Sequence, residues 1–337
     1  MTNDFAENPP LVQLTRGEHV ESQHRGAWVL VDTQGNVIDG AGRVEDAFFA
    51  RSSLKSMQVL PLLETGAAER FEVSDAELAL CCASHNAEDA HTLPVRSFLE
   101  RVGLSVEHLQ CGPQPPGEPT VRARLREEGE KPGSVHNNCS GKHAGFLALA
   151  QHLSVEPDKY LDPESESQVL VRRAVSDMTG LEPSDLYTAI DGCSAPTFRL
   201  PLRALATGIA RVANPDGLAP ERRAACERIC DAVAAHPGLI AGEHKRLCTQ
   251  IARVTEGRVF PKIGGEAIYV LGMRGADRGI AVKMDDGDLR GLHPLVIDLL
   301  ARFDFLTRAE QEALDSWRER ELRNWAGIPI GETRVIA

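Results

Sequence analysis

The stretch EAIYVLGMRGADRGIAVKMD, residues 266–285, decides the fold class. Residues 266–273 and 279–285 are two β-type runs, and the charged, glycine-containing segment 274–278 separates them. Two such runs around a short polar segment predict a β-hairpin near the end of the chain. A second pair of strands is predicted near the start, where residues 19–31 and 37–41 flank a turn at residues 32–36.

The middle of the chain is mostly helical. Apolar spacing predicts a helix at residues 53–63 that ends near Gly66, and Ser74 with Glu77 forms a capping box before the next helix. Further helices are predicted at residues 91–102, 141–153, 164–179, 200–212, 220–235 and 244–255, and after the hairpin at 293–303 and 307–318.

Strands at both ends with helices between them predict an α+β fold, in which the two termini form one antiparallel sheet and a helical lobe is inserted. The predicted arrangement is a single domain over residues 1–337. Its sheet lobe comprises residues 11–50 plus 256–337, and its helical lobe comprises residues 51–255.

The composition excludes several classes of protein. Lys and Arg number 37 against 49 Asp and Glu, a net charge of -12, which argues against nucleic acid or an anionic membrane as a partner.

Residues 1–10 lack the basic start and apolar region of a signal peptide, and no apolar run approaches membrane-spanning length. The adjacent Cys81 and Cys82, and Cys226 four residues before Cys230, resemble reduced core thiols, so we expect a cytoplasmic protein.

A serine–lysine pair begins the predicted helix after the first strands. Ser52 and Lys55 are three residues apart, so both side chains are expected on one helical face. A neutral lysine can remove the proton of a serine nucleophile, and a helix start provides N–H groups for an oxyanion. The alternative interpretation is that Ser52 caps the helix and Lys55 is a solvated charge.

Polar loops supply the other candidates. Ser84 begins a Ser-His-Asn segment that is either functional or turn-forming. Cys139 precedes a helix beside Lys142, where it is a candidate nucleophile or metal ligand, or part of a capping loop. Cys193 lies in a second loop of small residues, and two single cysteines are a weak metal signal. Lys262 stands among small and apolar residues, where a surface turn is the simpler expectation.

Five segments together give a more specific signal than any one of them. They are residues 51–56 (RSSLKS), 84–86 (SHN), 138–143 (NCSGKH), 191–194 (DGCS) and 262–266 (KIGGE). In this order they resemble the rhizobial-type L-asparaginase family, and the resemblance spans about residues 12–285. Members of that family are similar in fold to serine β-lactamases and glutaminases. The resemblance implies a homodimer that hydrolyses L-asparagine to L-aspartate and ammonia.

The resemblance also implies roles for individual residues. Ser52 would be the nucleophile and Lys55 its base, with Ser84 and Lys262 as a second Ser–Lys pair; Lys283 is the alternative to Lys262. A zinc ion would be bound by Cys139, Lys142 and Cys193. The substrate's ammonium and carboxylate would be surrounded by Arg51, Asn138, His143 and Asp191.

Two other functions stay open at this point. One is a related acyl-transfer enzyme, such as a glutaminase, a peptidase or a β-lactamase. The absence of a clear Ser-Asp-Asn and of Lys-Thr-Gly counts against the penicillin-binding branch. The other is a zinc-stabilised amino-acid binding protein without catalytic activity.

Overall fold

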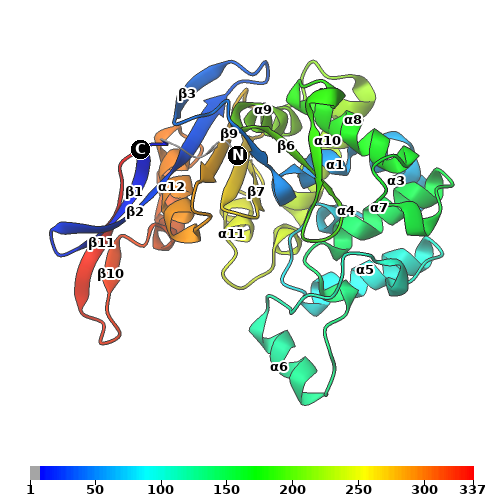
Figure 1. Cartoon of the computed structure of the whole chain (residues 1–337), viewed down its shortest axis with the longest axis horizontal. Helices are drawn as coiled ribbons and strands as arrows, with labels where there is room; N and C mark the ends of the chain where they lie inside the picture. The colour runs from blue at the N-terminus through cyan, green and yellow to red at the C-terminus, as the bar shows by residue number, and fades with distance from the viewer. Residues whose placement is uncertain (1–7) are drawn as a thin grey trace.

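The computed structural model describes residues 8–337, and in it strands from both chain ends share one antiparallel sheet (Figure 1). Its strands are β1 (Pro10–Arg16), β2 (His19–Val31), β3 (Val37–Ala41), β7 (Val259–Gly264), β8 (Ile268–Met273), β9 (Gly279–Met284), β10 (Glu321–Arg323) and β11 (Pro329–Val335). Within residues 8–337 this eight-stranded sheet has the order β10-β11-β1-β2-β9-β8-β7, with β3 paired to β2. The predicted α+β class and the sheet built from both termini are therefore confirmed.

The predicted hairpin is the pair β8 and β9, whose register places Gly272 opposite Gly279. The sequence analysis did not identify β1, β7, β10 or β11. In β7, Pro261 interrupts the strand pattern, because proline cannot donate a hydrogen bond to a neighbouring strand. Strand β10 has only three residues, too few to show an alternation.

Two helices cover opposite faces of this sheet. Helix α9 (Leu202–Ala213) packs on β2, β8 and β9, and the bare backbones of Gly272 and Gly279 allow it to approach closely. Helix α12 (Leu289–Arg302) lies on the other face, where Met284 meets its glycine at position 291. Because side chains alternate along a strand, Lys262 in β7, opposite Val270, points to the same side as α9.

The inserted helical lobe occupies the other half of the molecule (Figure 1). Its helices are α1 (Lys55–Gln58), α2 (Leu60–Glu64), α3 (Ala67–Arg70), α4 (Asp75–Cys81), α5 (Asp89–Arg101), α6 (Pro119–Glu127), α7 (Ser140–His152), α8 (Glu166–Thr179) and α10 (Pro220–Ala235). Helix α11 (Leu247–Val254) lies against β7 of the sheet. Helix α13 (Arg308–Leu314) follows α12 and precedes β10. Short 3₁₀ turns are η1 (Arg51–Leu54), η2 (Val106–His108), η3 (Ser134–His136), η4 (Pro157–Lys159), η5 (Pro183–Asp185), η6 (Pro237–Ile240) and η7 (Asp315–Arg318).

Several predicted helices have different bounds in the structure. The helix predicted at residues 53–63 is divided into η1, α1 and α2, with Pro61 in the first turn of α2. The helix predicted at 244–255 begins only at Leu247, because Lys245 has a φ of 50° that a right-handed helix cannot contain. The capping boxes Ser74–Glu77 and Thr307–Glu310 are both present.

A small second sheet joins the two lobes beside the candidate site. It contains β4 (Ala47–Phe49), β6 (Pro196–Pro201) and β5 (Tyr187–Ile190), in that order. The chain leaves β4 directly into Ser52, and the loop between β5 and β6 carries Asp191 and Cys193. Pairing of β4 with β6 therefore brings two segments, far apart in the sequence, to one place.

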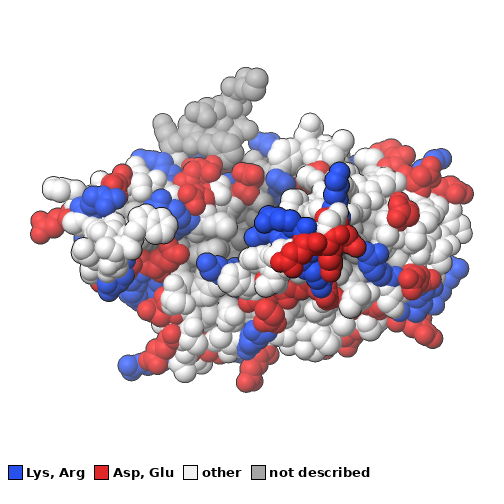
Figure 2. All heavy atoms as spheres, turned by 90° about the horizontal axis from the view of Figure 1, so that it is seen from below, with Lys and Arg blue, Asp and Glu red and all other residues white. Residues whose placement is uncertain are grey.

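The surface carries both signs of charge. Figure 2 shows basic and acidic side chains interspersed over the face that it draws. Among the helices of residues 8–337, none has the length and apolar character needed to cross a membrane.

Candidate active site

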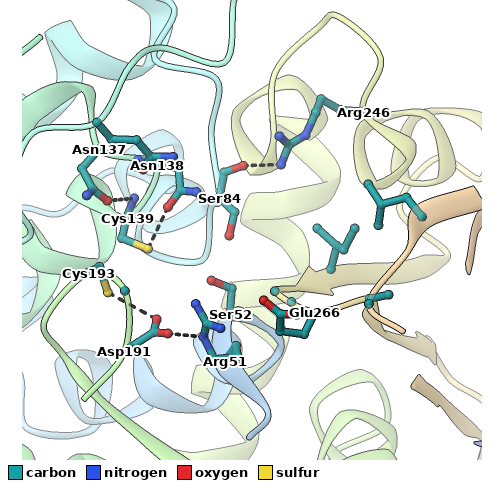
Figure 3. Close-up of a pocket in the computed structure, with 18 residues that line it drawn as sticks. Arg51, Ser52, Ser84, Asn137, Asn138, Cys139, Asp191, Cys193, Arg246 and Glu266 are labelled. Atoms are coloured by element: carbon teal, nitrogen blue, oxygen red, sulfur yellow. Dashed lines mark hydrogen bonds and ion pairs between the residues drawn. The ribbon is translucent and has the colours of Figure 1, made fainter. Parts of the chain in front are cut away.

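A cavity of about 460 Å³ opens between the two lobes (Figure 3). Its walls come from the segment after β4, the end of α4, the entry to α7, the β5–β6 loop, the approach to α11 and the β7–β8 turn. The lining includes the charged, polar and thiol side chains of Arg51, Ser52, Ser84, Asn138, Cys139, Asp191, Cys193, Arg246 and Glu266. Five of the predicted segments thus meet at one cavity.

The centre of the site is the hydroxyl of Ser84, which lies between two lysines. Lys55 Nζ donates to Ser84 Oγ at 3.1 Å, and Lys262 Nζ donates to the same oxygen at 2.9 Å. Both lysine side chains are fully buried. The predicted Ser84–Lys262 pair is therefore in direct contact, and Lys55 shares it.

Lys262 has the ionisation of a general base. The pKa of Lys262 is lowered to about 7, mainly by burial and secondly by the positive charge of Lys55. Its Nζ also donates to the carbonyl oxygen of Ile263 at 2.9 Å, which fixes its direction. A lysine with this pKa exchanges protons near neutral pH.

Ser52 belongs to η1 and lines the cavity, where it is partly exposed. The preceding residue, Arg51, has a φ of 53°, a left-handed conformation that places a tight bend before the serine. Lys55 Nζ bonds to Ser84, to the carbonyl of Ala83 and to Cys139. Among residues 8–337, Ser52 Oγ has no hydrogen bond with Lys55, so the serine remains open toward the cavity.

Arg51 and Asp191 form an ion pair through Arg51 Nε. Burial opposes ionisation of Asp191, but the charges of Lys142 and Arg51 outweigh it and lower the pKa of that carboxyl. Both residues line the cavity, and much of the charge of each is already balanced by the other.

Two cysteines and a lysine face one another on the opposite wall. Lys142 Nζ lies 3.2 Å from Cys193 Sγ, and Cys139 Sγ lies 3.1 Å from Lys55 Nζ. The hydrogen bond between the two thiols, ahead of all other causes, lowers the pKa of Cys193 to about 5 and raises the pKa of Cys139 to about 12. Burial alone would lower the pKa of Lys142, but the charges of Cys193, Cys139 and Asp191 raise it to about 12.

These three side chains can offer zinc two sulfurs and one nitrogen, provided that Lys142 and Cys139 lose the protons that their raised pKa values retain. A zinc ion takes thiolates at ~2.3 Å and nitrogen at ~2.0 Å, which places tetrahedral neighbours about 3.5 Å apart. The separation of 3.2 Å between Lys142 Nζ and Cys193 Sγ is close to that value. In residues 8–337 no group of three or more His, Cys, Asp or Glu side chains is arranged to hold a metal, so the lysine would have to serve as a ligand.

Two further predicted residues have different positions. Asn138 lines the cavity and its Oδ1 accepts from the Cys139 thiol at 3.0 Å. His143 is fully buried behind the wall, where its Nδ1 lies 2.6 Å from the Tyr160 hydroxyl. Burial, followed by the charge of Lys142, lowers the pKa of His143 to about 3, so its ring is neutral.

Lys283 occupies a separate place. It lines an adjoining cavity of about 510 Å³ with Phe48, Phe49 and Asp285, and its Nζ donates to the carbonyl of Met284. Lys262, and not Lys283, is the lysine that contacts Ser84.

Arg246 and Glu266 line the cavity, and neither had a role assigned from the sequence. Arg246 Nη2 donates to the carbonyl of Ser84 at 2.5 Å, and Nη1 donates to Asn86 Oδ1 at 3.0 Å. Glu266 follows the glycine pair at 264–265 in the β7–β8 turn. Arg246 belongs to none of the five segments, whereas Glu266 is the last residue of the segment at 262–266.

Comparison with known proteins shows a family. The sequence profile of L-asparaginase II matches residues 12–335. Among solved structures, Mglu in its glutamate form is 14% identical with a TM-score of 0.43, over 83% of this chain and 61% of Mglu. A β-lactamase from Mycobacterium bovis is 14% identical with a TM-score of 0.42, over 82% of this chain and 94% of the other.

The chain thus spans less than two thirds of the length of Mglu. No curated protein sequence matches it. The match to the family profile, however, covers nearly the whole chain and includes every segment that lines the cavity. This protein belongs to the L-asparaginase II family.

Proposed function

We propose that the protein hydrolyses L-asparagine to L-aspartate and ammonia, with Ser52 as nucleophile. The observation that carries this proposal is the Ser84 hydroxyl held between Lys55 and Lys262 in the cavity that Ser52 lines. A buried lysine pair of this kind supplies the base that a serine nucleophile requires. The family membership supports an amide as the substrate.

In the proposed reaction, Ser52 Oγ attacks the side-chain amide carbon and Lys55 takes the serine proton, while Lys55 passes one of its own protons through the Ser84 hydroxyl to neutral Lys262. The Ser84 hydroxyl connects Lys55 to Lys262. Because the pKa of Lys262 is near 7, this lysine can be neutral at neutral pH while Lys55 keeps its charge. The C–N bond then breaks, and ammonia leaves with a proton returned through the lysines and Ser84. A water molecule hydrolyses the acyl-enzyme by the reverse path, releasing L-aspartate and free Ser52.

Zinc is part of the proposal, with Cys139, Lys142 and Cys193 as its ligands. When bound, the ion would supply positive charge on the wall opposite Ser52. The donor chemistry of the three side chains supports it. Asn138 and the Arg51–Asp191 pair are proposed to surround the substrate, with His143 supporting the wall from behind.

The test measures ammonia release from L-asparagine and L-glutamine, and the colour change of a chromogenic β-lactam, with the purified protein. We expect asparagine to be turned over fastest. Turnover of glutamine or the β-lactam without asparagine would favour the related acyl-transfer enzymes, and asparagine binding without any turnover would favour the inactive binding protein.

A homodimer in the cytoplasm completes the proposal. All eight cysteines lie within residues 8–337 and are unpaired and buried, which suits a reducing compartment. The dimer is supported by the family resemblance alone. Light scattering coupled to size-exclusion chromatography tests it, and a mass near the 36.6 kDa of one chain would contradict it.

A further inference from the structure

We infer that Glu266 binds the α-ammonium group of the substrate, so that the site selects amides of free amino acids over amides that lack this group. The inference rests on the proposed function and names the feature of the substrate that the cavity recognises. It concerns a residue that ends the segment at 262–266 but had no role assigned from the sequence.

Glu266 reaches the cavity from the turn after β7. The register pairs Gly264 with Ile268, which leaves a turn of three residues with Glu266 at its centre. This turn follows Lys262 directly, so the glutamate is carried by the same hairpin as the lysine that contacts Ser84. Figure 3 shows its carboxylate on the side of the cavity nearest Ser52 and Arg51.

The charge of Glu266 is available to a ligand. The other carboxylate on the cavity wall, Asp191, is paired with Arg51. In the part of the chain that the structure describes, no hydrogen bond or ion pair joins the Glu266 carboxylate to another residue. The negative charge of Glu266 raises the pKa of Lys283, but less than the charge of Asp285 does. Lys283 Nζ donates to the carbonyl of Met284. A cationic group in the cavity would therefore find an unpaired carboxylate.

The cavity also contains a positive charge, that of Arg246, which like the charge of Glu266 has no ion-pair partner among residues 8–337. The guanidinium of Arg246 donates to a carbonyl and to an amide oxygen, and no carboxylate among residues 8–337 forms an ion pair with it. The cavity thus presents one carboxylate and one guanidinium whose charges are unpaired. A zwitterionic amino acid is the small molecule that complements both.

The backbone holds Glu266 in an uncommon conformation. Its φ is 60° and that of Ala267 is 52°, both left-handed values that glycine would adopt more easily. The turn is fixed by its surroundings, since a Cβ atom at Gly265 would lie 3.2 Å from Arg51 Cζ and one at Gly287 would lie 2.9 Å from Glu266 Oε2. Strain of this kind persists where a side chain must be held for function.

The experiment compares two substrates in matched variants. Succinamate is asparagine without its α-amino group, so it cannot use the proposed contact. We expect Glu266→Gln to lower kcat/KM for L-asparagine about 100-fold and to change kcat/KM for succinamate less than threefold. Glu256→Gln is the control: Glu256 is also an exposed glutamate with positive φ, 50°, and it lies outside the cavity. It is expected to leave both values unchanged.

Equal losses for both substrates, or no loss for asparagine, would overturn the inference. Glu266→Gly provides a second variant, since it relieves the left-handed backbone and removes the same charge; it is expected to show the same selectivity with no decrease in melting temperature. Failure of the proposed function has a different signature, in which the unmodified protein releases ammonia from neither substrate.

Discussion

Lys262 Nζ lies 2.9 Å from Ser84 Oγ, and on the other side of the same oxygen lies Lys55 Nζ, at 3.1 Å. Two buried ammonium groups this close repel each other, so one of them gives up its proton more easily. Lys262 is the one with the lowered pKa, about 7. The same contact has consequences for activity and for stability.

Lys262 predicts a pH dependence of catalysis. Its neutral form, the base, predominates above pH 7 and disappears as the pH falls below 7. We expect kcat/KM to rise with pH through this region. Lys262→Arg, which cannot lose its proton near neutrality, should lower kcat/KM at least 100-fold and remove that rising limb. A rising limb of unchanged midpoint in the variant would contradict the assignment.

The same lysine predicts an effect on stability. Its folded pKa, about 7, lies below its ordinary value of 10.5, so the unfolded chain binds more protons between these values. The contribution of Lys262 to stability therefore falls as the pH decreases from 10.5 to 7, and stays low below 7. Lys262→Met is expected to raise the free energy of unfolding at pH 6 by at least about 1 kcal/mol. Denaturant unfolding at pH 6 checks this, and a less stable variant would contradict it.

Removal of the Ser52 hydroxyl is expected to cause a large loss of activity. Ser52→Ala should lower kcat by about 1,000-fold or more, as expected for a nucleophile. Ser56→Ala is the matched control, because Ser56 lies in the adjoining helix α1 and its buried hydroxyl has no partner among the described residues. It should retain activity. If Ser52→Ala loses less than about tenfold, roughly 1.4 kcal/mol, Ser52 is not the nucleophile.

The cysteine pair predicts the metal content. Protein purified without added metal is expected to contain zinc, and Cys139→Ala or Cys193→Ala should reduce the content at least tenfold. Cys226→Ala is the control, since Cys226 is buried in α10 and does not line the cavity. Elemental analysis of the four proteins provides the measurement. Equal zinc in all of them would show that these thiols are not ligands.

Close packing of α4 against α7 predicts a stability effect at Gly141. A Cβ atom there would lie 2.3 Å from the carbonyl oxygen of Leu80, so Gly141→Ala must push the helices apart. We expect a loss of about 2 kcal/mol or more in thermal or denaturant unfolding. Gly133→Ala is the control, because its φ is -102° and no atom lies within 4 Å of the added carbon. Equal stabilities of the two variants would contradict the packing argument.

Much of the fold followed from local patterns. The β-type runs in β8 and β9 and the polar segment between them predicted the hairpin, and the Ser74 capping box was found as predicted. Strand β7 was not predicted, because Pro261 interrupts its strand pattern. The helix predicted at residues 53–63 is interrupted before Pro61. Local signals report the backbone preferences of a segment, and they fail where a proline or a left-handed residue overrides the pattern.

The sequence by itself determined that the protein is an α+β chain with a Ser–Lys spacing at residues 52–55 and polar loops that resemble those of asparaginases. Only the tertiary structure decided that both lysines contact Ser84, that His143 lies behind the wall, and that Glu266 enters the cavity. The physical reason is that spacing fixes which face a side chain occupies on its own element. Which faces meet, and how strongly burial and a neighbouring charge then shift a pKa, depends on the packing of segments far apart in the chain.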